Sequence, residues 1–185
     1  MENKFLAHIA EDGREQTVFE HLAAEFSRPF GGEAQGLLAG TAHDIGKYSA
    51  AFQRRLTGDS RRVDHATAGA MGRGQPFAAF AVAGHHGGLP DGGGRGDGPE
   101  AATFWGRIKR AGRGGLEPYG AWAREVSLPG GQPPPFAKQN PGAGMFFIRM
   151  LYSCLVAADF LDTEAFMSGK PRGSCSGCWT KRAPA

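Results

Sequence analysis

The histidines of this chain constrain its fold more than any other feature, because they lie within segments whose apolar residues follow a helical period. Five of the six histidines lie on or at the end of such a segment, and two aspartates accompany them. A polar side chain that is buried without a partner is costly, so these groups need something to satisfy them. Neutral imidazole and carboxylate are good ligands for first-row divalent metals. The pattern therefore indicates a metal centre assembled from several helices. The residues concerned are His21, His43, Asp44, His65, His85, His86 and Asp159.

The first two helices are predicted over residues 15–26 and 33–56. In the first, apolar residues recur at helical spacing with His21 beside them. In the second, His43 and Asp44 fall in the middle of the segment. Each segment therefore places part of the expected metal centre on its apolar side.

The next two segments carry the remaining histidines. A third helix is expected to begin near Asp64 and to carry His65. The alanine-rich residues 77–88 form a fourth segment that ends in His85 and His86, just before a glycine pair that is typical of a helix end.

The second half of the chain alternates irregular and helical segments. Residues 90–100 and 129–144 are too rich in glycine and proline for regular structure. Residues 101–126 are predicted to form one or two short helices, and residues 145–166 one long helix. On that helix Asp159 follows the apolar side, so its carboxylate is expected to point into the interior.

These elements predict an all-α fold, a helical bundle with long Gly/Pro-rich loops. No segment alternates like a strand, and no internal repeat is visible. A chain of 185 residues has room for one domain with a real core, expected over residues 1–168. Residues 169–185 are polar and without a period, and are predicted to be a disordered tail.

Composition gives weaker indications of the partners, membrane association and cellular compartment of the protein. The formal charge of +3 favours a polyanionic partner only slightly. We expect no signal peptide and, because no run of about 18 apolar residues occurs, no membrane span. Three cysteines do not form a disulfide framework, so a reduced, cytoplasmic protein is expected.

The order of these motifs resembles the HD-nuclease domain of type I CRISPR interference systems, a member of the HD superfamily. The HD pair alone is a weak signal, because many nucleotide phosphohydrolases have it. The combination of HDIGKYS, DHATAGA and GHHGGLPD is far more specific and is most similar to the type I-C branch. The similar stretches, which span residues 5–167, are QTVFEHL, AGTAHDIGKYSAAFQRRL, VDHATAGA, AVAGHHGGLPDGG and LVAADFLDTEAF.

The resemblance implies a hydrolase with two divalent transition-metal ions (Mn, Fe, Co, Ni or Zn). Two ions about 3.5–4 Å apart can clamp a phosphodiester and supply a hydroxide nucleophile. By resemblance, Asp44 bridges the ions and is catalytic, and Lys47 contacts the scissile phosphate or protonates the leaving group. The first ion is assigned to His21, His43, Asp44 and Asp159, and the second to His65, His85 and His86 with Asp44.

The implied activity is cleavage of single-stranded DNA in antiviral defence, with a helicase domain or subunit and a crRNA-guided surveillance complex as partners. Two basic stretches could line a path for the strand, although a solvated helix face is the usual explanation of such runs. Two alternatives stay open: an HD phosphohydrolase acting on nucleotides, and a catalytically idle docking module. The basic stretches consist of Arg54, Arg55, Arg61 and Arg62, and of Arg107, Lys109, Arg110 and Arg113.

Overall fold

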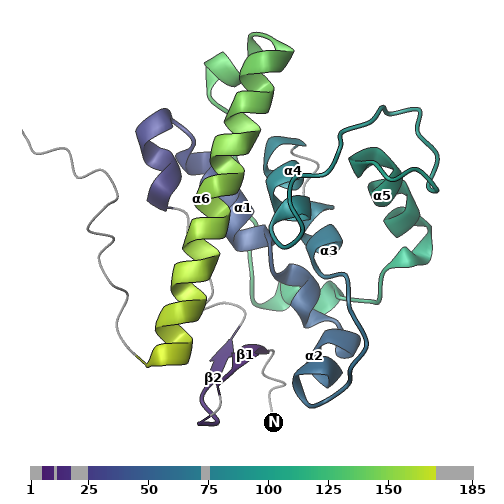
Figure 1. The fold of residues 1–185 in the computed structure, drawn as a ribbon, viewed down its shortest axis with the longest axis vertical. Helices are drawn as coiled ribbons and strands as arrows, with labels where there is room; N and C mark the ends of the chain where they lie inside the picture. The colour runs from purple at the N-terminus through teal and green to yellow at the C-terminus, as the bar shows by residue number, and fades with distance from the viewer. Residues whose placement is uncertain (1–5, 11, 18–24, 72–75, 170–185) are drawn as a thin grey trace, which may run out of the picture.

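The computed structural model describes residues 6–10, 12–17, 25–71 and 76–169. Within these ranges helices form the core, and the prediction of an all-α fold is confirmed. The predicted tail lies almost wholly outside the described residues. Figure 1 shows the long helix α6 (Pro141–Ser168) running the length of the molecule, with most of the shorter helices on one side of it.

Helix α6 is the longest element, and both of its ends follow from local chemistry. Asn140 caps its N-terminus by accepting a hydrogen bond from the backbone N–H of Ala143 (2.9 Å), and Pro141 occupies the first turn, where a missing N–H costs nothing. Gly169 ends the helix in the left-handed conformation (φ 65°). The helix therefore begins a turn before the predicted residue 145.

The core lies where α6 packs on α4 (Pro76–Gly84). Helix α1 (Glu33–Ala42) contacts both of them, and the 3₁₀ turns η1 (Glu25–Phe30) and η6 (Pro135–Lys138) also pack against α6. Alanines make up much of α4, and most of its side chains are buried, which lets its neighbours approach closely on several sides. The largest buried apolar side chains of this core include Leu38, Val82, Phe104, Phe147 and Leu151.

By length and composition alone, α6 could cross a membrane. Core helices of proteins outside membranes share this length and composition. One face of α6 packs inside the molecule through residues such as Phe147, Leu151 and Leu155.

The predicted single helix over residues 33–56 is wrong, because the chain breaks at the His43–Asp44 pair. Helix α1 ends at Ala42, a 3₁₀ turn η2 (Ile45–Tyr48) follows, and α2 (Ala50–Leu56) starts afresh. A Cβ at Gly46 would collide with the backbone of His65, so the turn is pressed directly against the next segment. This tertiary contact, which has no signature in the local apolar period, lies within the break.

The predicted helix over residues 15–26 is also wrong at both of its ends. Strand β2 (Glu15–Thr17) pairs antiparallel with β1 (Leu6–Ile9), which corrects the expectation of no strand, and η1 replaces the helical C-terminus. The middle of the segment, with His21, lies outside the described residues. Arg14 ties this hairpin to the end of α6 by donating to the carbonyl of Phe166 (2.7 Å), and the two lie close together in Figure 1.

The remaining elements agree better with prediction. Helix α3 (Ala66–Ala70) follows His65, and residues 101–126 form α5 (Phe104–Arg110), a π-helical turn η4 (Ala111–Gly115) and a 3₁₀ turn η5 (Gly120–Arg124). Residues 90–100 have no regular structure, as expected. The predicted irregular segment 129–144 is correct only in its first part, since η6 and the start of α6 fall inside it.

The close approach of α3 to the end of α1 gives a test of the fold. A Cβ at Gly69 would collide with the carbonyl oxygen of Ala42 and crowd Val82. We therefore expect Gly69→Ala to lower the free energy of unfolding by ~1–3 kcal/mol through overpacking, measured by urea denaturation. The control Gly112→Ala adds a methyl in open space and is expected to change stability by less than about 0.5 kcal/mol. Equal stability of the two variants would contradict this packing.

Candidate metal centre

Three segments bring most of the predicted ligands together at one place. His43 and Asp44 lie in the turn after α1, and His65 directly precedes α3. His85 and His86 follow the last residue of α4. The small residues that allow these segments to touch, Gly46 and Gly69, therefore also set the spacing of the polar side chains.

The Asp44 carboxylate lies at the centre of the group and is almost fully buried, with its side chain 3% exposed. Its Oδ1 lies 3.7 Å from Nε2 of His65 and 4.0 Å from Nε2 of His85. Its Oδ2 lies 2.7 Å from Nζ of Lys47 and 3.4 Å from Nε2 of His43. The two oxygens of one carboxylate thus face two different sets of side chains.

On the Oδ1 side, four residues form a group that could hold a metal ion. One ligand atom from each of Asp44, His65, His85 and His86 lies within 4.8 Å of all the others. Nε2 of His65 and Nε2 of His86 are 2.8 Å apart. This is hydrogen-bond distance, and two nitrogens that each lie ~2.1 Å from one tetrahedral ion are separated by about 3.4 Å, so the two rings would have to move apart only slightly to share a metal.

Backbone carbonyls fix the orientation of two imidazoles. Nδ1 of His43 lies 2.7 Å from the carbonyl oxygen of Gly40, and Nδ1 of His85 lies 2.6 Å from that of Val82. When Nδ1 carries the proton for this bond, Nε2 of the neutral ring presents a lone pair to the site. This is the arrangement by which proteins commonly prepare histidine for a metal.

Two buried ring nitrogens lack a hydrogen-bond partner among the described residues. They are Nε2 of His85, which faces Asp44, and Nδ1 of His65. An unsatisfied buried polar atom costs roughly 1–3 kcal/mol of stability. The ion pair between Lys47 and Asp44 leaves both ring nitrogens unsatisfied, because Lys47 bonds the carboxylate and not the imidazoles. A cation at the group would satisfy Nε2 of His85, and the residues present therefore fit a metal.

Burial keeps most of these histidines neutral. It lowers the pKa of His85 to about 3 and that of His65 to about 4, and it also lowers the pKa of the less buried His86. At neutral pH these rings are in the form that binds metals. For His43, burial acts in the same direction, but the carboxylates of Asp44 and Asp159 outweigh it and raise the pKa.

Asp159 borders the site from α6 and is less buried than its place in the pattern indicates. Its Oδ1 lies 3.8 Å from Nε2 of His43, and its side chain is 18% exposed. The fully interior acid of α6 is instead Asp162, at 5% exposure. Asp162 follows Leu155 and Ala158 on the buried side of the helix, so the helical period could have identified it.

Arg107, one of the residues that could line a strand path, contacts the segments that carry the candidate ligands. Its guanidinium donates to Asp64 Oδ1 (2.8 Å), to the carbonyl oxygen of Ala83 (2.8 Å) and to Thr67 Oγ1. It therefore ties α5 to the residue before His65 and to the end of α4. Arg107 is a positioning residue for the group.

Its neighbours in the same stretch also have structural partners. Lys109 donates to the carbonyl oxygens of Arg95 and Asp97 (2.5 Å each), and Arg110 to that of Pro99 (2.6 Å). These bonds hold the irregular loop that precedes α5.

The chain has no counterpart in two comparisons with known proteins. No protein-family model matches it, and neither does any curated protein. The structure itself carries a mostly helical fold with a buried group of three histidines and an aspartate that could hold a metal ion. His21, the remaining predicted ligand, lies outside the described residues.

Metal binding by this group can be tested with an isosteric change. Asp44→Asn keeps the shape of the side chain but removes the charge shared by both sides of the site. We expect its affinity for Mn²⁺, Co²⁺ or Ni²⁺ to fall at least about tenfold, measured by isothermal titration calorimetry on chelator-stripped protein. The control Asp12→Asn changes an exposed carboxylate that pairs with Arg14 (2.7 Å) outside the site and should bind as the wild type does. Unchanged affinity in Asp44→Asn would place bound metal elsewhere.

Proposed function

We propose that this chain is a metal-dependent deoxyribonuclease that hydrolyses phosphodiester bonds in single-stranded DNA. The observation that carries the proposal is the position of the histidine–aspartate group at a groove of about 510 Å³. His65 and His86 belong to both the group and the groove, and Lys47 lines the groove beside them. A phosphodiester in the groove would therefore reach the candidate metal ligands directly.

The two sides of Asp44 support a pair of ions rather than one. On the Oδ1 side lie His65, His85 and His86. On the Oδ2 side lie His43 and, next to it, Asp159. A bridging carboxylate between two ligand sets fits this arrangement, and by resemblance His21 completes the second set. Two divalent ions bound there supply Lewis acidity toward the phosphodiester and a water of lowered pKa.

The protein's own groups would orient and stabilise the reacting phosphate. The carbonyls of Gly40 and Val82 hold two rings in place, so little reorganisation is needed when charge develops. Lys47, nearly buried and 2.7 Å from Asp44, carries three N–H donors and no acceptor. Its ammonium is suited to hold a non-bridging phosphoryl oxygen or to give a proton to the leaving oxygen.

The choice of DNA as substrate comes from the resemblance of HDIGKYS, DHATAGA and GHHGGLPD to the HD-nuclease domain of type I CRISPR systems. On this proposal the chain works in the cytoplasm, away from membranes, with a helicase domain or subunit and a crRNA-guided surveillance complex that deliver the strand. The HD phosphohydrolase alternative needs a pocket for one base and sugar. The exposed Arg55 and Arg62 along the groove favour an extended polyanion instead.

Cleavage of a labelled single-stranded oligonucleotide tests the proposal. Chelator-stripped protein is supplied in turn with Mn²⁺, Co²⁺, Ni²⁺ or Mg²⁺. We expect cleavage with one or more of the transition metals and at least about a hundredfold loss in Asp44→Ala, because the shared carboxylate is gone. Asp12→Ala should cut normally.

Three results would contradict the proposal of a deoxyribonuclease. Folded wild-type protein that cuts no DNA with any of these metals is not a nuclease. Hydrolysis of mononucleotides without any cleavage of DNA would instead support the phosphohydrolase. Metal binding without any hydrolysis would support the docking module.

A further inference from the structure

The four arginines of the first basic stretch differ in where they lie in the structure. Arg55 and Arg62 line the groove that contains His65 and His86. Arg61 lines only a neighbouring cavity of about 270 Å³, to which Arg62 also contributes. Arg54 belongs to neither set of lining residues. Adjacent arginines therefore differ in whether they line the groove that contains His65 and His86.

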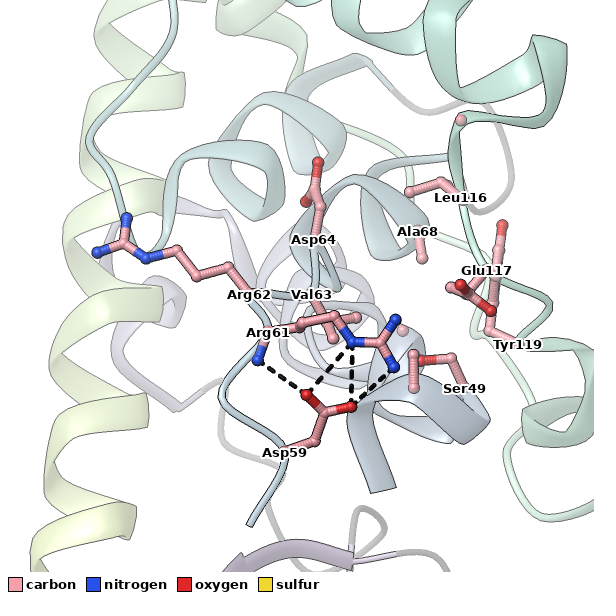
Figure 2. Close-up of a pocket in the computed structure, with 13 residues that line it drawn as sticks. Ser49, Asp59, Arg61, Arg62, Val63, Asp64, Ala68, Leu116, Glu117 and Tyr119 are labelled. Carbon is pink, nitrogen blue, oxygen red and sulfur yellow. Dashed lines mark hydrogen bonds and ion pairs between the residues drawn. The ribbon is translucent and has the colours of Figure 1, made fainter. Parts of the chain in front are cut away.

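The charge of Arg61 is already neutralised. Its guanidinium bonds Asp59 through both Nε and Nη2, with Nη2 2.9 Å from Oδ2. Figure 2 shows Arg61 turned toward Asp59 in this cavity, near Glu117 and Tyr119, while the side chain of Arg62 extends away from them.

The guanidinium groups of Arg55 and Arg62 have no carboxylate or other hydrogen-bonding partner among the described residues, and both side chains are exposed. The groove between them and the metal group also contains Lys47, so it carries positive charge that the protein itself only partly compensates. Guanidinium binds phosphate through two parallel hydrogen bonds, which suits it to a polynucleotide backbone. Phe52 is buried against His65 (ring centroids 5.1 Å apart), so it supports the groove rather than offering a surface for base stacking.

We propose that Arg55 and Arg62 form a phosphate-binding subsite that holds the backbone of a single strand beside the phosphodiester to be cut. The inference rests on the proposed function and deepens it. It assigns the groove to an extended strand recognised through its phosphates, without base readout. The subsite therefore predicts binding that depends strongly on salt and little on sequence.

Two double variants give a matched test because each removes two positive charges from the same stretch. Arg55→Ala/Arg62→Ala removes the two arginines that line the groove, whereas Arg54→Ala/Arg61→Ala leaves the groove residues unchanged. Affinity for a fluorescein-labelled oligothymidylate is measured by anisotropy on the full chain in EDTA, as a function of salt. We expect the first variant to bind about 10- to 100-fold more weakly at low salt and its log K–log[salt] slope to fall by about 1.4, two phosphate contacts at ~0.7 each. The second should change affinity less than about threefold.

The outcomes separate this inference from the function on which it rests. Equal losses in both double variants, or no loss in either, overturn the subsite whatever the catalytic result. Hydrolysis of the small diester bis(p-nitrophenyl) phosphate in the presence of the activating metal measures catalysis apart from strand binding, and it should be unchanged in the control Arg54→Ala/Arg61→Ala. If the wild type hydrolyses no diester, the nuclease proposal fails, while a loss of oligothymidylate binding confined to Arg55→Ala/Arg62→Ala still supports the subsite.

Discussion

The burial of one carboxylate, that of Asp44, is the constraint on which the rest of the structure depends. An ionised carboxylate loses several kcal/mol of solvation in the interior unless cations or hydrogen bonds replace the water. Here Lys47 supplies one cation at 2.7 Å, and imidazoles from three segments surround the remaining lone pairs. The break after α1, the short helix α3 and the end of α4 all lie where they bring a polar group to this carboxylate.

The surroundings of the carboxylate also explain how a small helical fold could carry out metal chemistry. Carbonyl oxygens fix His43 and His85, and Arg107 ties the segments that carry His65 and His85. The candidate ligands are thus held in place by the protein itself. The groove meets the same group on its accessible side, at His86, so on the proposed function binding and chemistry would share one wall.

Much of the helical fold and of the candidate metal site was predictable from the sequence, and the predictions that were wrong have physical causes. A metal centre assembled from several segments was predicted, because buried imidazoles on separate apolar segments need a common partner, whereas the grouping of Asp44 with His65, His85 and His86 was implied by the family resemblance. The break at residues 43–49 was not, since it depends on the contact of Gly46 with a distant backbone. The β1–β2 hairpin is too short to show a period of two. The composition of the basic stretch also does not show that Arg61 pairs with Asp59 while Arg62 lines the groove. Which group each arginine contacts depends on the path of the folded chain.

The most direct test of the account is a crystal structure of the protein grown with Mn²⁺, with anomalous diffraction recorded above the manganese absorption edge. A metal centre at Asp44 should give an anomalous peak bounded by Asp44 Oδ1 and the rings of His65, His85 and His86, and a second on the Oδ2 side near His43 and Asp159. This prediction would be contradicted by protein saturated with Mn²⁺ that shows no peak at either place and retains the Lys47–Asp44 ion pair unchanged. The buried group would then be a structural polar cluster without a metal.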